Sequence, residues 1–217
     1  VTSATDDVTF TGLPQPESKC GGQPVTFTVA ATGGTGYQWK KNGSALSGQT
    51  SATLNISAVA LTDTGTYTCD ITGGTCGSTP SNAAYLTVNA VPTASISPSA
   101  ASICAGASQT LTASGSGTYA WSNSGGSTAA ATFTPSSTTS YTVTVTAGIC
   151  SATASSTVTV NAIPTASIIP ATVTICAGDA ANLTASGGGT YAWSNSGGTT
   201  AAASFSPTST ATYTVTV

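Results

Sequence analysis

The sequence predicts an all-β protein built from small antiparallel sandwiches in tandem, and two local observations support this fold class. Short runs alternate β-branched or aromatic residues with Thr or Ser, as in Val25–Val29, Tyr141–Val145 and Tyr213–Val217. This alternation is typical of strands that bury one face. Clusters of Gly, Pro, Asn and Ser separate the runs, and no stretch has apolar residues at helical spacing over three turns.

A repeat of 72 residues predicts the domain organisation. The phrase Tyr-Ala-Trp-Ser-Asn-Ser-Gly-Gly at residues 119–126 returns at residues 191–198. A fixed period of this kind indicates tandem modules. The similar phrases at residues 88–92 and 160–164 each hold a Pro, which restricts the linker. We therefore expect three domains in a semi-rigid row, at residues 1–89, 90–161 and 162–217, and the last domain lacks its final strand.

Composition excludes several classes of function. The 217 residues include three Lys or Arg, six Asp or Glu and no His, and only 4% are charged. Nucleic acids and anionic membranes attract clustered Lys and Arg, so neither is expected as a partner. Without His there is no activated Ser or zinc site of the usual kinds. No apolar run approaches the length of a membrane span, so direct membrane insertion is not expected. We predict no enzyme activity, cofactor or metal.

The first domain resembles the immunoglobulin fold of the intermediate or variable type. The residues that carry the resemblance are Gln38–Gly43, Leu54–Ile56 and Asp63–Cys69. The resemblance implies that Trp39 is the buried strand-C tryptophan and that Tyr67 forms a tyrosine corner. One departure is that the strand-B cysteine of that family falls on Val29.

The repeat extends this expected core to the other two domains. The predicted core residues are Trp39, Trp121, Trp193, Tyr67, Tyr141 and Tyr213. Trp121 and Trp193 could instead stack on sugars. A core position is favoured because a tyrosine lies two residues before each tryptophan, on the same strand face.

The second and third domains resemble repeats of large secreted surface proteins of Bacteroidota, which include the giant adhesins of gliding motility. The residues that carry this resemblance are Ile103–Gly106, Tyr119–Asn123, Tyr141–Val145 and Gly148–Cys150. The resemblance implies tandem Ig-like domains at the extracellular cell surface. It names no ligand.

Two disulfides are predicted from the positions of the cysteines within the repeat. Cys76 follows Tyr67 by nine residues, as Cys150 follows Tyr141, while Cys20 and Cys104 each begin a Cys-(Gly/Ala)-Gly turn. We therefore predict Cys20–Cys76 and Cys104–Cys150, each closing one domain. Cys20–Cys69 is the alternative, because other Ig domains pair the corresponding strands. Such bonds indicate an oxidising, extracellular location.

Two cysteines are expected to be unpaired. Cys69 should be a buried thiol packed against Val29. The partner of Cys176 would lie at position 222 by the repeat, so we expect the natural chain to continue beyond residue 217. The alternative is a subunit whose open edge accepts a strand such as Val1–Thr11 from another copy.

The function expected from these observations is structural. The repeats would form the stalk of a secreted cell-surface adhesin or extracellular filament. Their partners would be neighbouring repeats or other copies of the protein, with surface glycans or other cells as further candidates. Two alternatives are a filament subunit joined by strand exchange and a ligand-binding accessory module of a secreted enzyme. The only ligand loop suggested for the latter is Lys40–Gly43, which also fits a plain hairpin.

Overall fold

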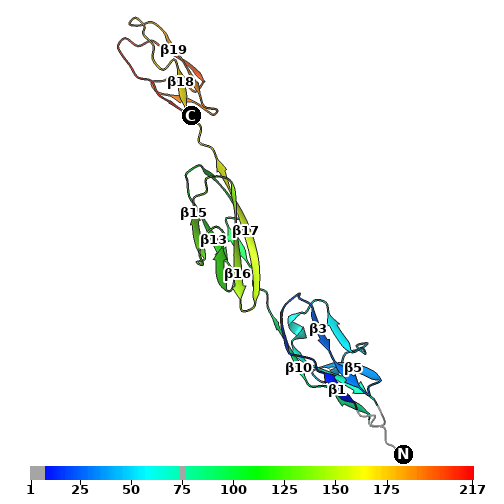
Figure 1. Ribbon diagram of the computed structural model, residues 1–217. Coiled ribbons are helices and arrows are strands. Elements are labelled where there is room, and N and C mark those ends of the chain that lie inside the picture. The colour runs from blue at the N-terminus through cyan, green and yellow to red at the C-terminus, as the bar shows by residue number, and fades with distance from the viewer. Residues whose placement is uncertain (1–7, 74–76) are drawn as a thin grey trace, which may run out of the picture. The chain divides into compact units, whose positions relative to one another are not determined.

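The computed structural model describes residues 8–73 and 77–217, and their regular elements are strands apart from one short 3-10 helix (Figure 1). The chain divides into two compact units. Unit 1 comprises Val1–Ala101, Gln109–Phe133 and Ser140–Val158, and unit 2 comprises Ser102–Ser108, Thr134–Thr139 and Thr159–Val217. The fold class is confirmed: the described residues form Ig-like antiparallel β-sandwiches in tandem.

The first sandwich contains the strands β1 to β10. Its larger sheet has the order β2-β10-β8-β5-β6 with β9 added to β8, and its other strands pair as β3-β7 and β1-β4. All pairs are antiparallel except β2 with β10, which is parallel. The bounds are β1 Thr9–Gly12, β2 Glu17–Cys20, β3 Val25–Thr28, β4 Ala30–Thr32, β5 Gly36–Lys41, β6 Ser44–Ala45, β7 Thr53–Ile56, η1 Leu61–Asp63, β8 Gly65–Thr72, β9 Ser78–Pro80 and β10 Ala84–Asn89.

The core of this sandwich is aromatic. Phe27 stacks on Tyr67 with ring centroids 5.0 Å apart and lies 6.2 Å from Trp39. The Tyr67 hydroxyl donates a hydrogen bond to the Asp63 carbonyl at 2.8 Å, which is the geometry of a tyrosine corner. Because Tyr67 is buried and lies near the Asp63 carboxylate, its pKa rises to about 12.

The N-terminal strand is used within its own sandwich, which corrects part of the strand-exchange expectation. In β1, Thr9 pairs with Thr32 and Phe10 with Ala31. Val8 and Phe10 also pack against the first core. Residues 8–11 are therefore not an unpaired donor strand, and residues 1–7 of the expected segment lie outside the described residues.

The second sandwich has a three-stranded sheet, β11-β13-β15, and a four-stranded sheet, β12-β17-β16-β14. Alternate residues of β16 are buried, as the Thr-Val pattern predicts. Phe133 stacks on Tyr141 with centroids 3.9 Å apart and meets Trp121 edge-on. The bounds are β11 Ser95–Ser97, β12 Ala100–Cys104, β13 Gln109–Ser114, β14 Thr118–Trp121, β15 Ala130–Phe133, β16 Thr139–Ala147 and β17 Cys150–Asn161.

The third sandwich repeats part of this plan, with sheets β18-β19-β21 and β20-β22. Phe205 and Trp193 meet as Phe133 and Trp121 do. Tyr213 stacks on Phe205 and packs against the third core, but it is only half-buried, whereas its counterpart Tyr141 is buried. The bounds are β18 Ser167–Ile169, β19 Ala181–Ser186, β20 Ala192–Trp193, β21 Ala202–Phe205 and β22 Val215–Thr216.

Candidate functional site

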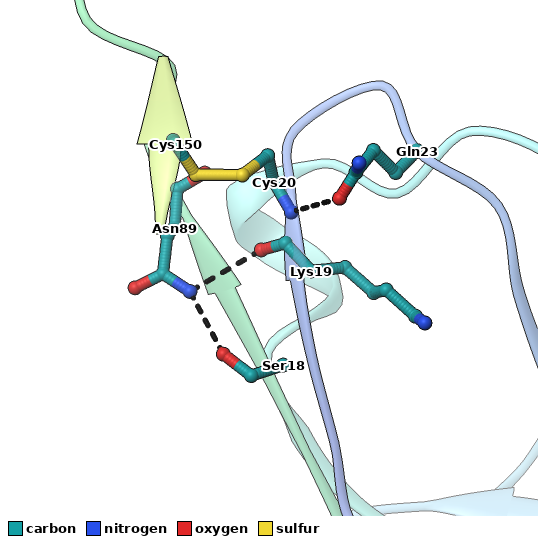
Figure 2. Close-up of a disulfide and its surroundings, with 6 residues drawn as sticks. All are labelled: Ser18, Lys19, Cys20, Gln23, Asn89 and Cys150. Atoms are coloured by element: carbon teal, nitrogen blue, oxygen red, sulfur yellow. Dashed lines mark hydrogen bonds between the residues drawn. A yellow bond between two sulfur atoms is a disulfide. The ribbon is translucent and has the colours of Figure 1, made fainter. Parts of the chain in front are cut away.

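A disulfide between Cys20 and Cys150 is the most specific chemical feature of the described residues (Figure 2). Cys20 ends β2 of the first sandwich, and Cys150 begins β17 of the second. Their Cα atoms are 5.7 Å apart, although 130 positions separate them in the sequence. The bond lies within unit 1 and joins two successive sandwiches.

A tight turn holds Cys20 in place. The Cys20 N–H donates to the side-chain oxygen of Gln23 at 2.8 Å, and the Gln23 N–H donates back to the Cys20 carbonyl at 3.0 Å. Gly22 has φ 85°, in the left-handed region that glycine adopts without strain. Its N–H donates to the Val59 carbonyl at 2.7 Å. The Cys-Gly-Gly phrase therefore has a structural purpose: it turns the chain while fixing the cysteine at the end of β2.

Asn89 connects this turn to the exit of the chain from the first sandwich. It is the Cα partner of Cys20 in the parallel β2–β10 pair, and its side-chain amide donates to Ser18 Oγ at 3.0 Å and to the Lys19 carbonyl at 3.3 Å. Its carbonyl accepts the Gly21 N–H at 2.9 Å. The disulfide and the peptide link to the next sandwich thus leave from paired residues on neighbouring strands (Figure 2).

Cys150 is placed by a two-residue hairpin between β16 and β17. Gly148 in this turn has φ 60°, as hairpin turns of this length require. The Cys150 sulfur lies 3.8 Å from the Asn89 carbonyl oxygen. Because a disulfide sulfur has no proton, this approach is a van der Waals contact. Cys150 is 1% exposed and Cys20 is 9% exposed, so the bond is shielded from dissolved reductants.

The predicted disulfides are wrong in their pairing. The structure joins Cys20 to Cys150, which excludes Cys20–Cys76, Cys20–Cys69 and Cys104–Cys150, and Cys76 itself lies outside the described residues. Strand direction explains the error. Ala105, next to Cys104, donates its N–H to Asn161 at the end of β17, whereas Cys150 begins that strand. At about 3.3 Å per residue the two ends are roughly 36 Å apart, and a disulfide spans at most about 7 Å between Cα atoms.

Three other cysteines are free thiols in the described residues. Cys69 is buried in the cluster that includes Val29 and Trp39, in line with its expected packing role. Burial raises the pKa of the Cys69 thiol, because desolvation disfavours the thiolate. Cys104 and Cys176 are exposed. Cys176 was expected to be unpaired, whereas Cys104 was not.

Each of the three lysines lies beside an acidic side chain. Lys19 pairs with Glu17 at 3.0 Å, Lys40 pairs with Asp70, and Lys41 lies 3.7 Å from Asp63. The Lys40–Gly43 loop is a two-residue hairpin, in which Lys41 pairs with Ser44 while Asn42 and Gly43 have φ 50° and 82°. This is the plain hairpin that an Asn-Gly sequence favours.

The tryptophans do not form sugar-stacking platforms. Trp39, Trp121 and Trp193 are 0%, 8% and 7% exposed. Each indole N–H donates to a backbone carbonyl at 2.9 Å, from Ser51, Thr128 and Thr200 respectively. With their faces packed and their polar atoms satisfied, the three side chains belong to the cores.

Chemistry of other kinds has little support in the part of the chain that the structure describes. There, no three His, Cys, Asp or Glu side chains gather in an arrangement that could hold a metal ion. The same residues contain no helix with the length and apolar character needed to cross a membrane. What the arrangement can do chemically is form and keep a covalent cross-link.

Comparison with known proteins places the first sandwich in a family. Residues 9–72 match the family model described as immunoglobulin domain. Comparison with the curated proteins gave no match at the level of sequence. Because the family match covers less than half of the chain, it identifies this sandwich and not the whole protein.

Several solved structures are similar to the chain, all at low sequence identity. The insect immune protein hemolin, whose structure carries implications for homophilic adhesion, has 16% identity and a TM-score of 0.49 over 74% of this chain, and this chain spans 48% of hemolin. The I67–I69 fragment of the titin I-band has 17% identity and a TM-score of 0.46, over 88% of this chain and 80% of that fragment. The N-terminal four Ig domains of Dscam1 isoform 6.9 have 20% identity and a TM-score of 0.35, over 68% of this chain and 43% of that one.

Proposed function

We propose that the chain is a series of spacer modules in an extracellular, surface-attached adhesive protein, with modules at residues 1–89, 90–161 and 162–217. The observation that carries this proposal is the Cys20–Cys150 bond between successive sandwiches. A bond within one sandwich would stabilise that sandwich alone. A bond between two sandwiches also limits how they bend and separate, which is what a spacer needs.

The junction resists bending because it has two covalent attachments. Asn89 leads into the peptide linker, and Cys20, its partner on the neighbouring strand, carries the disulfide. Paired strands lie about 4.8 Å apart, so the two attachments are side by side and not on one axis. Rotation and bending of the second sandwich about the linker are thereby restricted.

The surface of the second sandwich suits a spacer rather than a charged binding partner. Hydroxyl groups satisfy one another across its strands, as in Thr110 with Thr132 at 2.8 Å and Ser140 with Thr157 at 2.9 Å. The region between Asp70 and Asp179 has no charged residue. Such a surface gives little long-range electrostatic attraction, so we assign the chain no enzyme activity and no nucleic-acid partner.

The cross-link supports an extracellular compartment. Disulfides persist in oxidising, extracellular surroundings. The resemblance of Tyr119–Asn123 and Tyr141–Val145 to repeats of Bacteroidota surface adhesins, gliding-motility adhesins among them, supports a cell-surface place. Partners would then be neighbouring modules, other copies, surface glycans or other cells.

The test is a module swap in the whole protein on its own cells. Residues 90–161 are replaced by an unrelated sandwich of equal length that keeps a Gly-Ile-Cys hairpin for bonding to Cys20, or they are deleted, and adhesion of the cells to their substratum is measured. A spacer predicts that the swap keeps adhesion and that deletion weakens it. Loss of adhesion in the swap, with surface display unchanged, would show that these residues bind a ligand.

A second candidate function, acceptance of a strand from another chain, is favoured by a cavity in the third sandwich. The cavity holds about 560 Å³ and is lined in part by Ile168, Pro170, Leu183 and Tyr213. In the second sandwich β17 is the neighbour of β16, which carries Tyr141, the counterpart of Tyr213. There Val158 is fully buried, and Ser156 donates to the Pro98 carbonyl at 2.8 Å. A strand of the β17 type is therefore the occupant that we propose for the cavity.

A peptide tests this candidate directly. The peptide with the sequence of Ser151–Asn161 is added to the chain, and binding is followed by Tyr213 and Trp193 fluorescence. The control peptide carries Val158→Asp, which puts a charge where an apolar side chain is required. Strand acceptance predicts that only the first peptide binds, and equal binding or no binding of both contradicts it.

A further inference from the structure

Three turns of the same design each present a cysteine, and only one of these cysteines is bonded within the described residues. The turns begin at Cys20, Cys104 and Cys176. In each, the cysteine carbonyl accepts the N–H three residues later, at 3.0, 3.1 and 3.1 Å respectively. The second residue after each cysteine is a glycine with φ between 83° and 87°. The three cysteines therefore occupy equivalent turns.

The surroundings of Cys104 share two backbone and side-chain contacts with those of Cys20. The Ala105 N–H donates to the Asn161 carbonyl at 2.8 Å, as Gly21 does to Asn89 at 2.9 Å. The Asn161 amide donates to Ser102 Oγ at 2.7 Å, as Asn89 does to Ser18 at 3.0 Å. The chain then leaves Asn161 through the same Asn-Ala-(Val/Ile)-Pro linker. The turn, the asparagine contacts and the linker are therefore shared, whereas Gln23, whose side chain accepts the Cys20 N–H, is replaced by Ala107.

We infer that Cys104 is a second cross-linking site, whose partner is the cysteine of a β16–β17-type hairpin in the module that follows Asn161. Cys150 shows which thiol fits: it lies in a Gly-Ile-Cys hairpin and meets the turn of the preceding sandwich. By the 72-residue repeat, the matching hairpin cysteine of the third module would stand at position 222. The proposal concerns bonding between modules and does not depend on the adhesive role.

The bond would form by thiol–disulfide exchange with a small-molecule disulfide such as oxidised glutathione. The Cys104 thiolate attacks one glutathione sulfur and releases one glutathione thiolate. The hairpin thiolate then attacks the Cys104 sulfur and releases the second. Two protein thiols lose two protons and two electrons, and one glutathione disulfide becomes two glutathiones.

Staggered bonds of this type would overlap along the chain. The loop closed by Cys20–Cys150 and the loop closed from Cys104 share residues 104–150. The shortest covalent path between the two bonds then runs through this shared segment. Each sandwich would be locked to the sandwich before it and to the one after it.

The test extends the present chain. A copy of Thr146–Asn161 is appended after Val217, which continues the repeat in register and puts a cysteine at position 222. The protein is oxidised with glutathione buffer, digested without reduction and mapped by mass spectrometry. The matched control carries serine in place of the appended cysteine, and its thermal unfolding reports whether the extended third sandwich folds.

The expected result is a peptide pair that links Cys104 to the appended cysteine, with Cys176 still open to alkylation. A bond from the appended cysteine to Cys176, or a free thiol at Cys104 in the folded extended chain, would overturn the inference. If the extension does not fold, the same mapping is made on the protein from its own cells. There, Cys104 joined to a hairpin cysteine of a following module supports the inference, and Cys104 recovered as a thiol overturns it.

Discussion

The Cys20–Cys150 bond should keep most of the first two sandwiches from being stretched when the chain is pulled from its ends. The 130 positions between the two cysteines cannot extend while the bond is intact, because the force passes through the two sulfurs. At about 3.5 Å per extended residue, this withheld length is roughly 450 Å. Cys20→Ser should release it, so a single molecule pulled from its two ends in an optical trap should reach a contour length that is longer by about that amount.

The matched control for this experiment is Cys104→Ser. Cys104 has an equivalent turn, but it is a free, exposed thiol in the structure. The substitution should leave the contour length of the oxidised chain unchanged. Equal extension of the oxidised wild-type chain and of Cys20→Ser would refute the reasoning, since it would mean that no bond encloses this stretch.

The remaining predictions concern thiols, packing and ionisation. In the folded 217-residue chain iodoacetamide should label Cys104 and leave Cys69 unmodified, because Cys69 is buried and its raised pKa disfavours the thiolate. Equal labelling of the two would contradict the buried position of Cys69. Gly125→Ala should lower the free energy of unfolding, measured in urea, by about 1–3 kcal/mol, because the new Cβ would lie 2.6 Å from side-chain atoms of Trp121 and Phe133. The control Ser127→Ala, at an exposed position, should change this free energy little. The free energy of unfolding should fall as the pH rises from about 10 to about 12, because the unfolded state then loses the Tyr67 proton that the folded state keeps. Tyr67→Phe should remove this part of the fall. An unchanged pH profile in that variant would contradict the raised pKa of Tyr67.

The strands and cores could be predicted because they depend on local pattern and on the repeat. Alternation in Tyr141–Val145 determines which side chains face inward. The immunoglobulin resemblance of Asp63–Cys69 anticipates the hydrogen bond from Tyr67 to the Asp63 carbonyl. The half-buried state of Tyr213 was not anticipated, because it depends on which strand covers the third sandwich and not on the pattern of its own strand.

The disulfide could not be predicted from the repeat, although the repeat identified the right structural elements. It grouped Cys20 with Cys104, which begin similar turns, and Cys76 with Cys150, which each follow a tyrosine by nine residues. It did not show at which end of a sandwich each group lies. That depends on the parallel pairing of β2 with β10, which sets Cys20 opposite Asn89 at the exit of the chain. The direction of β2 is a long-range property, and it turns a predicted bond within a domain into a bond between domains.

Mapping the disulfides of the folded 217-residue chain, without any extension, tests the central claim most directly. The folded protein is alkylated, digested with a protease of broad specificity without reduction, and analysed by mass spectrometry. The account predicts one linked peptide pair that contains Cys20 and Cys150, with Cys104 alkylated. Recovery of Cys20 linked to Cys76 or to Cys69, or of Cys150 linked to Cys104, would contradict it, because each sandwich would then be closed on itself.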